Sequence, residues 1–258
     1  MIEVHNLTFG YSSTEDGQIL KGVDFAANTG KLTALIGTNG AGKSTLLKTI
    51  MGILKGKGEI SVNGKPVSQY STKDFSSTVS YLSQDNDCKV NLSVFEVVML
   101  GRMGSMSFRV SDEDIAATQE VLERLNLQRF ASRSIMELSG GQRQLVFMAQ
   151  ALVKEPKILI LDEPTSALDL HKQFDLLTLL KSLTQENDFT TLVTLHHLDL
   201  AAMFADEIIV LKEGTVYAQG APKDIFTEAM MEDVYRVKTK IYMDDRGLPH
   251  VISLEAIP

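Results

Sequence analysis

The segment GTNGAGKST, residues 37–45, constrains the fold more than any other part of the chain. It follows an apolar run at residues 32–36 and precedes a predicted helix at about 43–51 that stops at Gly52. A G-x-x-x-x-G-K-[S/T] loop between a strand and a helix wraps its backbone amides around phosphates. Its lysine reaches the β- and γ-phosphates, and its serine hydroxyl ligates Mg²⁺. The pattern therefore predicts a nucleotide site formed by Gly37, Thr38, Asn39, Gly40, Ala41, Gly42, Lys43, Ser44 and Thr45.

A second polar element, KILILDEP at residues 157–164, ends an apolar strand with two carboxylates. Asp162, at the end of the strand, is a candidate to hold Mg²⁺ through water. Glu163 points elsewhere and is a candidate to polarise a water molecule for attack on the γ-phosphate. A solvated Asp-Glu pair is the alternative, but a hydrolase with a phosphate loop needs both a metal ligand and a base.

The stretch LSGGQRQ, residues 138–144, predicts a second helix start suited to phosphate. The Ser139 hydroxyl and the Gly140 and Gly141 amides are the candidate donors, and the helix dipole adds about half a positive charge. No lysine completes a second nucleotide loop here. The donors serve either the chain's own nucleotide or that of a second copy arranged head-to-tail about a two-fold axis. A plain helix N-cap remains the alternative.

The pattern of apolar residues predicts an α/β fold. Strands are expected at residues 2–9, 20–27 and 32–36, with a hairpin at Asn63-Gly64. Residues from about 86 to 136 are predicted to be helical, with a capping box at Ser111 and Asp114. Strands at 157–161, 190–195 and 207–212 alternate with helices at about 170–186 and 197–204, which indicates a mostly parallel sheet with flanking helices. The expected parts are a β-rich region with the phosphate loop at 1–85, a helical subdomain at 86–136, a core at 137–215 and an extension at 216–258.

Composition narrows the class of protein. The 258 residues carry a formal net charge of −8, which argues against nucleic acid as the main partner. A single cysteine, Cys88, excludes a disulfide within the chain and favours a reducing compartment. We expect no signal peptide, and no apolar run approaches the roughly 20 residues that span a bilayer. Work at a membrane would therefore require docking onto another protein.

These motifs, in this order and spacing, resemble the nucleotide-binding subunit of an ABC transporter. The resemblance extends over essentially the whole chain and includes SALD at residues 166–169. It implies that two subunits enclose two ATP molecules, each held by one phosphate loop and by the partner's signature residues. Those residues here are Ser139, Gly140, Gly141 and Gln142. It also implies an active, Mg²⁺-dependent ATPase, since every catalytic position is intact.

The resemblance assigns four further residues. Gln84 matches a glutamine that touches Mg²⁺ or the attacking water and senses the membrane partner. His196, rather than its neighbour His197, matches the histidine that contacts the γ-phosphate. Asp169 matches an aspartate at the interface between subunits, and Tyr11 matches the aromatic residue that stacks on adenine. The alternatives are a surface amide for Gln84 and a core aromatic residue at a strand end for Tyr11.

Residues 90–108 and the tail resemble importers of iron chelates, haem and cobalamin. The resemblance implies a subunit on the cytoplasmic face of the membrane that drives ferric siderophore import, with haem, cobalamin and molybdate as alternatives. It also implies permease subunits docking near Gln84 and the helical subdomain, and an extracytoplasmic binding protein acting indirectly. Met99, Met103 and Met106 are either a soft surface for that partner or core of the helical arm. An exporter ATPase and a soluble ABC ATPase remain as alternatives. A GTPase is excluded because no Asn-Lys-x-Asp tetrapeptide occurs.

Overall fold

The chain folds into two compact units, which are described separately. The computed structural model describes residues 1–12, 17–84, 91–102 and 110–258. The first unit is Met1–Gln69 with Leu177–Pro258, and the second is Tyr70–Leu176. Within the described ranges, no helix is both long and apolar enough to cross a bilayer.

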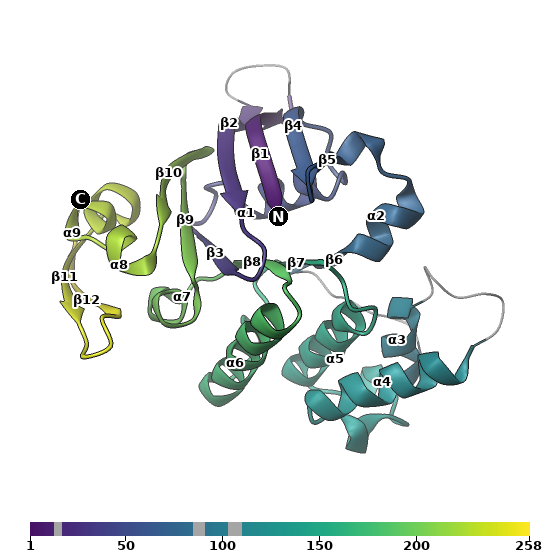
Figure 1. The fold of residues 1–258 in the computed structure, drawn as a ribbon. Helices are drawn as coiled ribbons and strands as arrows, with labels where there is room; N and C mark the ends of the chain where they lie inside the picture. Colours follow the sequence, from purple (N-terminus) through teal and green to yellow (C-terminus); the bar gives the residue numbers. More distant parts are fainter. Residues whose placement is uncertain (13–16, 85–90, 103–109) are drawn as a thin grey trace. The chain divides into compact units, whose positions relative to one another are not determined.

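An antiparallel sheet opens the first unit, in the order β2-β1-β4-β5 (Figure 1). Its strands are β1 (Ile2–Gly10), β2 (Gln18–Ala27), β4 (Lys57–Val62) and β5 (Lys65–Pro66). Asn63 and Gly64 join β4 to β5 with φ values of 51° and 74°. A two-residue type I′ turn requires positive φ at both positions. The hairpin predicted at this dipeptide is therefore confirmed.

A mostly parallel sheet forms the core of the first unit. Strand β3 (Leu32–Ile36) pairs in parallel with β8 (Thr190–Thr194) on one side and β9 (Glu207–Lys212) on the other. All residues of β3 and β8 are buried, which is why these strands lack the alternation of a half-exposed strand. Strand β10 (Thr215–Gly220) is antiparallel to β9. Helices α1 (Lys43–Ile50) and α7 (Leu198–Phe204) follow β3 and β8.

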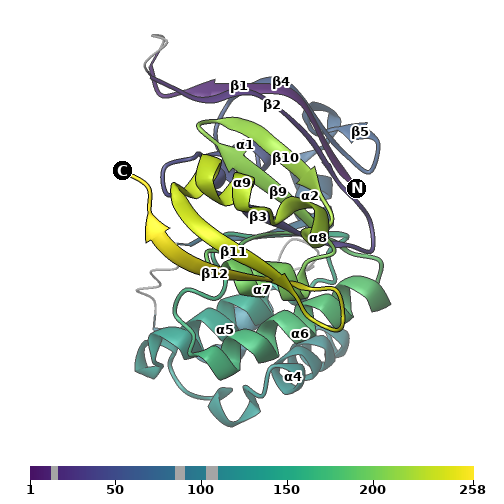
Figure 2. The same ribbon diagram turned by 90° about the vertical axis from the view of Figure 1, so that its left-hand side faces the viewer.

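A compact C-terminal segment completes the first unit beside β10 (Figures 1 and 2). It contains α8 (Pro222–Ile225), α9 (Glu228–Met230) and the π-helical turn η6 (Met231–Tyr235). The hairpin of β11 (Val237–Met243) and β12 (Pro249–Ala256) follows. The sequence analysis predicted an extension here but none of these elements.

The second unit contains two parallel strands and a group of helices. Strand β6 (Val79–Leu82) pairs with β7 (Ile158–Leu161), so that Leu82 lies opposite Leu161. The helices are α2 (Thr72–Thr78), α3 (Val94–Met99), α4 (Asp112–Arg124), α5 (Gly140–Leu152) and the first part of α6 (Leu170–Glu186). Short 3₁₀ turns lie at Leu100–Arg102, Gln128–Phe130 and Ile135–Glu137.

Side-chain caps fix the helices of the second unit. Ser111 and Asp114 form the capping box predicted for α4, with Ser111 Oγ accepting from the Asp114 amide at 3.2 Å. Arg102 Nε donates to the Asp114 carboxylate at 2.5 Å, and its Nη1 donates to the Val153 carbonyl at 3.2 Å. One guanidinium therefore ties the end of the α3 region to both α4 and α5.

Candidate functional site

The phosphate loop lies in the first unit, between β3 and α1. Gly42, the N-cap of α1, has φ 104°, and Gly37 has φ 149°. A Cβ atom on Gly37 would lie 2.2 Å from the Leu211 carbonyl oxygen, which no side chain tolerates. The glycines of the motif therefore provide both backbone freedom and close packing against β9.

Lys43 closes the loop on itself. Its Nζ donates to the Gly37 carbonyl at 2.7 Å and to the Thr38 carbonyl at 3.0 Å, and the residue is only 7% exposed. Asn39 and Gly40, at the tip of the loop, are exposed, whereas Ser44 and Thr45 are half-buried. The tip of the loop is thus exposed, whereas the Lys43 ammonium is buried against the loop's own carbonyl groups.

His196 lies at the same sheet edge as this loop. Leu35 of β3 lies opposite Thr194 of β8, so the carboxyl ends of the two parallel strands are neighbours. The loop leaves β3 at that edge, and His196 follows β8 there with an exposed side chain. Adjacent carboxyl ends are the usual place for ligand-binding residues in parallel α/β sheets.

Tyr11 lies on the surface of the first unit. Its side chain is 72% exposed and packs edge-on against Phe9, with ring centroids 5.0 Å apart. The alternative of a core aromatic residue is therefore wrong. An exposed ring held by a neighbouring ring is a suitable platform for a base.

The second unit brings Gln84 and Glu163 together across 79 residues of sequence. Gln84 Nε2 donates to Glu163 Oε2 at 2.8 Å. The pairing of β6 with β7 explains this contact, because Gln84 follows one strand and Glu163 follows the other. Asp162 is 1% exposed, and its amide donates to the Leu82 carbonyl at 2.8 Å. Glu163 has φ 51°, so its side chain leaves the strand end in a different direction from that of Asp162.

The signature stretch forms the start of α5. Ser139 is the N-cap: its Oγ accepts from the Gln142 amide at 3.3 Å, while Gln142 Oε1 accepts from the Ser139 amide at 2.9 Å. The N-cap alternative is thus correct as far as local structure goes. It leaves the Ser139 hydroxyl proton available as a donor, since the oxygen acts only as acceptor in this box. Ser139 and Gly140 are exposed.

Gly141 and Asp169 connect this helix start to the loop before α6. A Cβ on Gly141 would lie 2.9 Å from the Ala167 carbonyl oxygen, so α5 and the loop pack in direct contact. Asp169 Oδ1 accepts from the Lys172 amide at 3.0 Å and its Oδ2 lies 2.9 Å from Lys172 Nζ. The backbone bond from Lys172 is the main cause of the lowered pKa of Asp169, followed by its side-chain bond. Asp169 is therefore an ionised cap of α6 within its own chain.

Two buried glutamines were missed by the sequence analysis. Gln173 is 7% exposed, and its Nε2 donates to the Thr165 and Leu168 carbonyls at 3.1 and 3.0 Å. It fixes the loop that carries Asp169. Gln144, also 7% exposed, has no partner for its Nε2 among the described residues. Only the last letter of LSGGQRQ signals Gln144, and nothing in the sequence signals Gln173.

The candidate ligands are of the chemical kind that Mg²⁺ prefers. Among the described residues, no group of three or more His, Cys, Asp or Glu side chains is placed to hold a metal ion. The candidates Asp162, Ser44 and Gln84 offer one carboxylate, one hydroxyl and one amide oxygen. Mg²⁺ prefers such hard oxygen ligands and is usually bound by one or two carboxylates together with substrate phosphates. The residues fit this ion.

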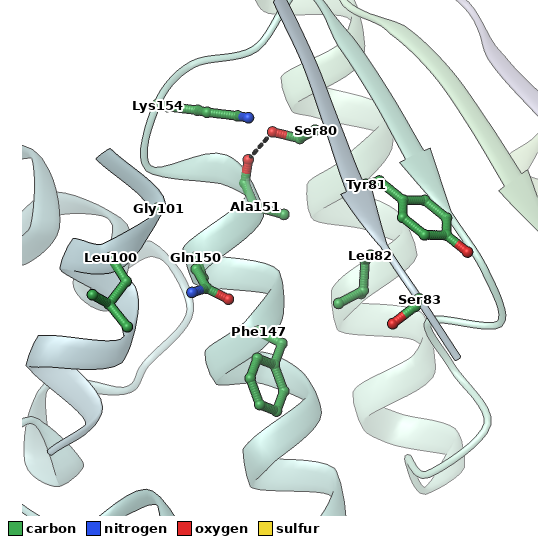
Figure 3. Close-up of a pocket in the computed structure, with 10 residues that line it drawn as sticks. All are labelled: Ser80, Tyr81, Leu82, Ser83, Leu100, Gly101, Phe147, Gln150, Ala151 and Lys154. Atoms are coloured by element: carbon green, nitrogen blue, oxygen red, sulfur yellow. Dashed lines mark hydrogen bonds between the residues drawn. The ribbon is translucent and has the colours of Figure 1, made fainter. Parts of the chain in front are cut away.

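A pocket of about 280 Å³ adjoins the candidate catalytic pair within the second unit. Figure 3 shows its lining from β6, from α5 and from the end of the α3 region at Leu100 and Gly101. Ser83, immediately before Gln84, is part of that lining. Lys154 at the rim donates to the Val79 carbonyl at 3.0 Å, and burial lowers its pKa. Met99 is half-buried on α3, whereas Met103, Met106 and Phe108 lie outside the described residues.

Comparison with known proteins gives consistent matches. The family model described as ABC transporter matches residues 20–166. The iron(3+)-hydroxamate import ATP-binding protein of Bacillus subtilis is 37% identical, over 95% of this chain and 91% of its own. The hemin import ATP-binding protein of Hahella chejuensis is 37% identical, over 91% of each chain.

Solved structures give the same fold. A transporter described as of the metal-chelate type, in an inward-facing conformation, matches with a TM-score of 0.83 and 29% identity over 98% of this chain and 97% of its own. The ATP-binding cassette MJ0796, dimeric and bound to ADP and Pi after hydrolysis, matches with a TM-score of 0.77 and 30% identity over 86% of this chain and 98% of its own. The predicted α/β fold class, a phosphate-loop core with an antiparallel β region and a helical insert, is confirmed.

Proposed function

Because this chain belongs to the ABC transporter family and is an ATP hydrolase of that family, we propose that it powers the import of a metal chelate, with a ferric siderophore as the first candidate. Support for this cargo comes from the names of the relatives, which act in iron(3+)-hydroxamate and hemin import. Haem, cobalamin and molybdate remain the alternative cargoes, in that order. An exporter ATPase and a soluble ABC ATPase are the alternative roles.

The observation that carries the catalytic part is the 2.8 Å hydrogen bond between Gln84 and Glu163. Glu163 is the general base: it accepts a proton from water as the water oxygen attacks the γ-phosphorus and ADP leaves. The amide of Gln84 orients this carboxylate. Its carbonyl oxygen is left to face the metal or the attacking water, since its nitrogen serves Glu163.

The phosphate loop and His196 hold the reacting phosphates. The backbone amides of Gly37–Thr45 surround the anion, and Lys43 turns from the Gly37 and Thr38 carbonyls to the β- and γ-phosphates. His196 donates to the γ-phosphate, and Tyr11 stacks on adenine. Ser44, Gln84 and Asp162 would hold Mg²⁺, which would neutralise charge on the phosphate oxygens.

A second copy of the chain completes each site. Ser139, Gly140, Gly141 and Gln142 of one subunit face the ATP of the other, and Asp169 lies at the interface between them. The exposed serine hydroxyl and helix N-terminus support this role, because both can donate to an anion. The division of the chain into residues 1–85, 86–136, 137–215 and 216–258 also stays a proposal.

The pocket at Ser83 and Leu100 is the proposed docking place for a polytopic permease subunit. A segment inserted there would press on the chain directly before Gln84, and so on the residue that orients Glu163. The chain would then lie on the cytoplasmic face of the membrane through this contact, and the extracytoplasmic binding protein would act on it only through the permease.

The test is purification of the tagged chain from its own cell membranes in mild detergent. We expect a polytopic membrane protein to co-purify, and the reconstituted complex to hydrolyse ATP faster when its binding protein carries a ferric siderophore. Leu100→Arg should reduce recovery of the permease, because Leu100 is 41% exposed at the pocket. Val110→Arg is the matched control: it is 48% exposed in the same unit but does not line the pocket.

Three outcomes would contradict separate parts of this proposal. Recovery of soluble partners alone would overturn the transport role while leaving the ATPase intact. Stimulation by haem or cobalamin but not by ferric siderophores would correct the cargo. Equal permease recovery with Leu100→Arg and with the wild-type chain would overturn the docking place.

A further inference from the structure

The pocket in the second unit contains one charged residue among the described residues that line it, Lys154. The other lining residues are neutral, and they come from β6, from α5 and from the turn that begins at Leu100 (Figure 3). The chain as a whole carries a formal net charge of −8. The pocket therefore presents a positive charge on a protein that is acidic overall.

Backbone carbonyl groups hold Lys154 at the rim of the pocket. Its Nζ donates to the carbonyl groups of Ser76 and Val79, the latter at 3.0 Å. Both acceptors are neutral, and no ion pair joins Lys154 to a carboxylate of the described residues. A lysine ammonium carries three N–H donors and no acceptor. With two donors on these carbonyls, the third is left for a group in the pocket.

The surroundings of Lys154 favour an anion as that group. Burial lowers the pKa of Lys154, because the charged ammonium is less stable there than in water. Two neutral carbonyl oxygens offset only part of this cost. A carboxylate would stabilise the ammonium by charge as well as by hydrogen bonding, and such charge-assisted bonds are roughly twice as strong as neutral ones.

The walls of the pocket are fixed against one helix. A Cβ atom on Gly101 would lie 2.2 Å from the Gln150 carbonyl oxygen, so the turn after α3 packs directly on α5. On the β6 side, the Ser80 hydroxyl donates to the Ala151 carbonyl at 2.6 Å (Figure 3). The cavity of about 280 Å³ is therefore already formed before a partner arrives.

Apolar surface lies in the same lining as the cation. Leu100 is 41% exposed, and Phe147 of α5 is half-buried. A small free anion could contact Lys154 but would leave these two side chains uncovered. A protein segment that carries both a carboxylate and apolar residues matches the whole lining, since a protein interface combines apolar contacts with a few polar ones.

We propose that the permease segment that docks at this pocket presents an Asp or Glu side chain, whose carboxylate accepts a hydrogen bond from Lys154 Nζ. Apolar residues of the same segment cover Leu100 and Phe147. This inference rests on the proposed docking place and adds to it the chemical character of the partner. It is independent of the cargo.

Zero-length cross-linking with a water-soluble carbodiimide tests this on the unmodified chain in its own membranes. The reagent joins a lysine amine to a carboxylate only where the two are in contact, by an amide bond formed as the carbodiimide takes up water. We expect mass spectrometry to find Lys154 joined to an Asp or Glu of a cytoplasmic loop of the permease. Lys157 should give no such product: it is an exposed lysine in the same unit that does not line the pocket.

Substitutions of Lys154 separate the charge from the length of the side chain. Lys154→Met removes the ammonium and keeps an unbranched chain. We expect the amount of permease that co-purifies to fall about three- to tenfold, as for loss of a partly exposed charged hydrogen bond. Lys154→Arg keeps the charge, so recovery should stay near that of the wild-type chain although the cross-link is lost. Lys157→Met should leave recovery unchanged.

The outcomes distinguish this inference from the docking place itself. If Leu100→Arg lowers permease recovery while Lys154→Met leaves it at the wild-type amount, the docking place stands and the carboxylate is wrong. If neither substitution lowers recovery, the docking place is wrong and the inference falls with it. Cross-links from Lys157 to the permease, with none from Lys154, would also overturn the inference, and this result does not depend on how well any variant folds.

Discussion

Glu163 illustrates how much a single backbone angle decides. Its φ of 51° is unfavourable for a residue with a Cβ atom, by about 1–2 kcal/mol. That conformation turns its carboxylate to Gln84, while Asp162, one residue earlier, stays buried at the strand end. Two adjacent carboxylates thereby acquire different surroundings, one buried and one half-buried, which suits the proposed roles of metal ligand and base.

Glu163→Gln should therefore separate binding from hydrolysis. We expect phosphate release to fall by about 10²-fold or more, because the amide cannot accept the proton. The Kd for MgATP should change little, since Glu163 does not form part of the phosphate loop. Glu155→Gln is a suitable control, because Glu155 is an exposed glutamate with the same φ of 51°. A Glu163→Gln protein that retained turnover would remove Glu163 from the role of base.

At the scale of elements, Arg102 acts as a structural clamp. It lies within residues 90–108, the segment that resembles metal-chelate importers. Its guanidinium is turned inward, on Asp114 of α4 and on the carbonyl of Val153 beyond α5. The side chains of Arg102 and Asp114 are 16% and 9% exposed. The arginine thus connects α4 to the end of α5, the helix that lines the pocket.

This clamp predicts a pH dependence of stability. Hydrogen bonds from Ser111 and from Arg102 lower the pKa of Asp114 from 3.8 to about 2. A depressed folded-state pKa means that the contribution is complete above about pH 4 and is lost as the pH falls toward 2. Asp114→Asn should lower the free energy of unfolding in urea at pH 7, and the deficit should shrink between pH 4 and 2. Asp112→Asn, on the same first turn of α4, is the control. A deficit independent of pH would contradict this origin.

For the whole molecule, the proposed role of the α5 start at Ser139 in binding phosphate depends on a second copy of the chain. We expect MgATP to bring two copies together, with Glu163→Gln trapping the dimer because hydrolysis no longer reopens it. Light scattering at millimolar MgATP should give the dimer mass for Glu163→Gln. The double variant with Lys43→Ala, which weakens phosphate binding, should remain monomeric under the same conditions. A monomer in both cases would assign Ser139 to capping alone.

Features encoded over short distances were predictable from the sequence. The phosphate loop, the Asn63-Gly64 hairpin and the capping box at Ser111 each depend on a few consecutive residues, and local chemistry specifies them. The bond between Gln84 and Glu163 could not be derived from spacing, because it arises from the pairing of two four-residue strands far apart in sequence. Gln84 was assigned a role only through the resemblance to the ABC family, and its contact with Glu163 was not predicted. The elements around Tyr235 were missed because three- to five-residue helical turns have too little periodicity to detect.

Lys43 has one further consequence. Its ammonium leaves water when the chain folds, and the two loop carbonyls then solvate it. The free-energy cost of removing water from the ammonium is therefore part of the folding free energy and not of the binding free energy. When phosphate binds, the ammonium exchanges neutral carbonyl acceptors for charged phosphate oxygens. A neutral ligand gains nothing from that exchange. The buried ammonium of Lys43 is thus expected to make the loop select for an anionic ligand by charge alone.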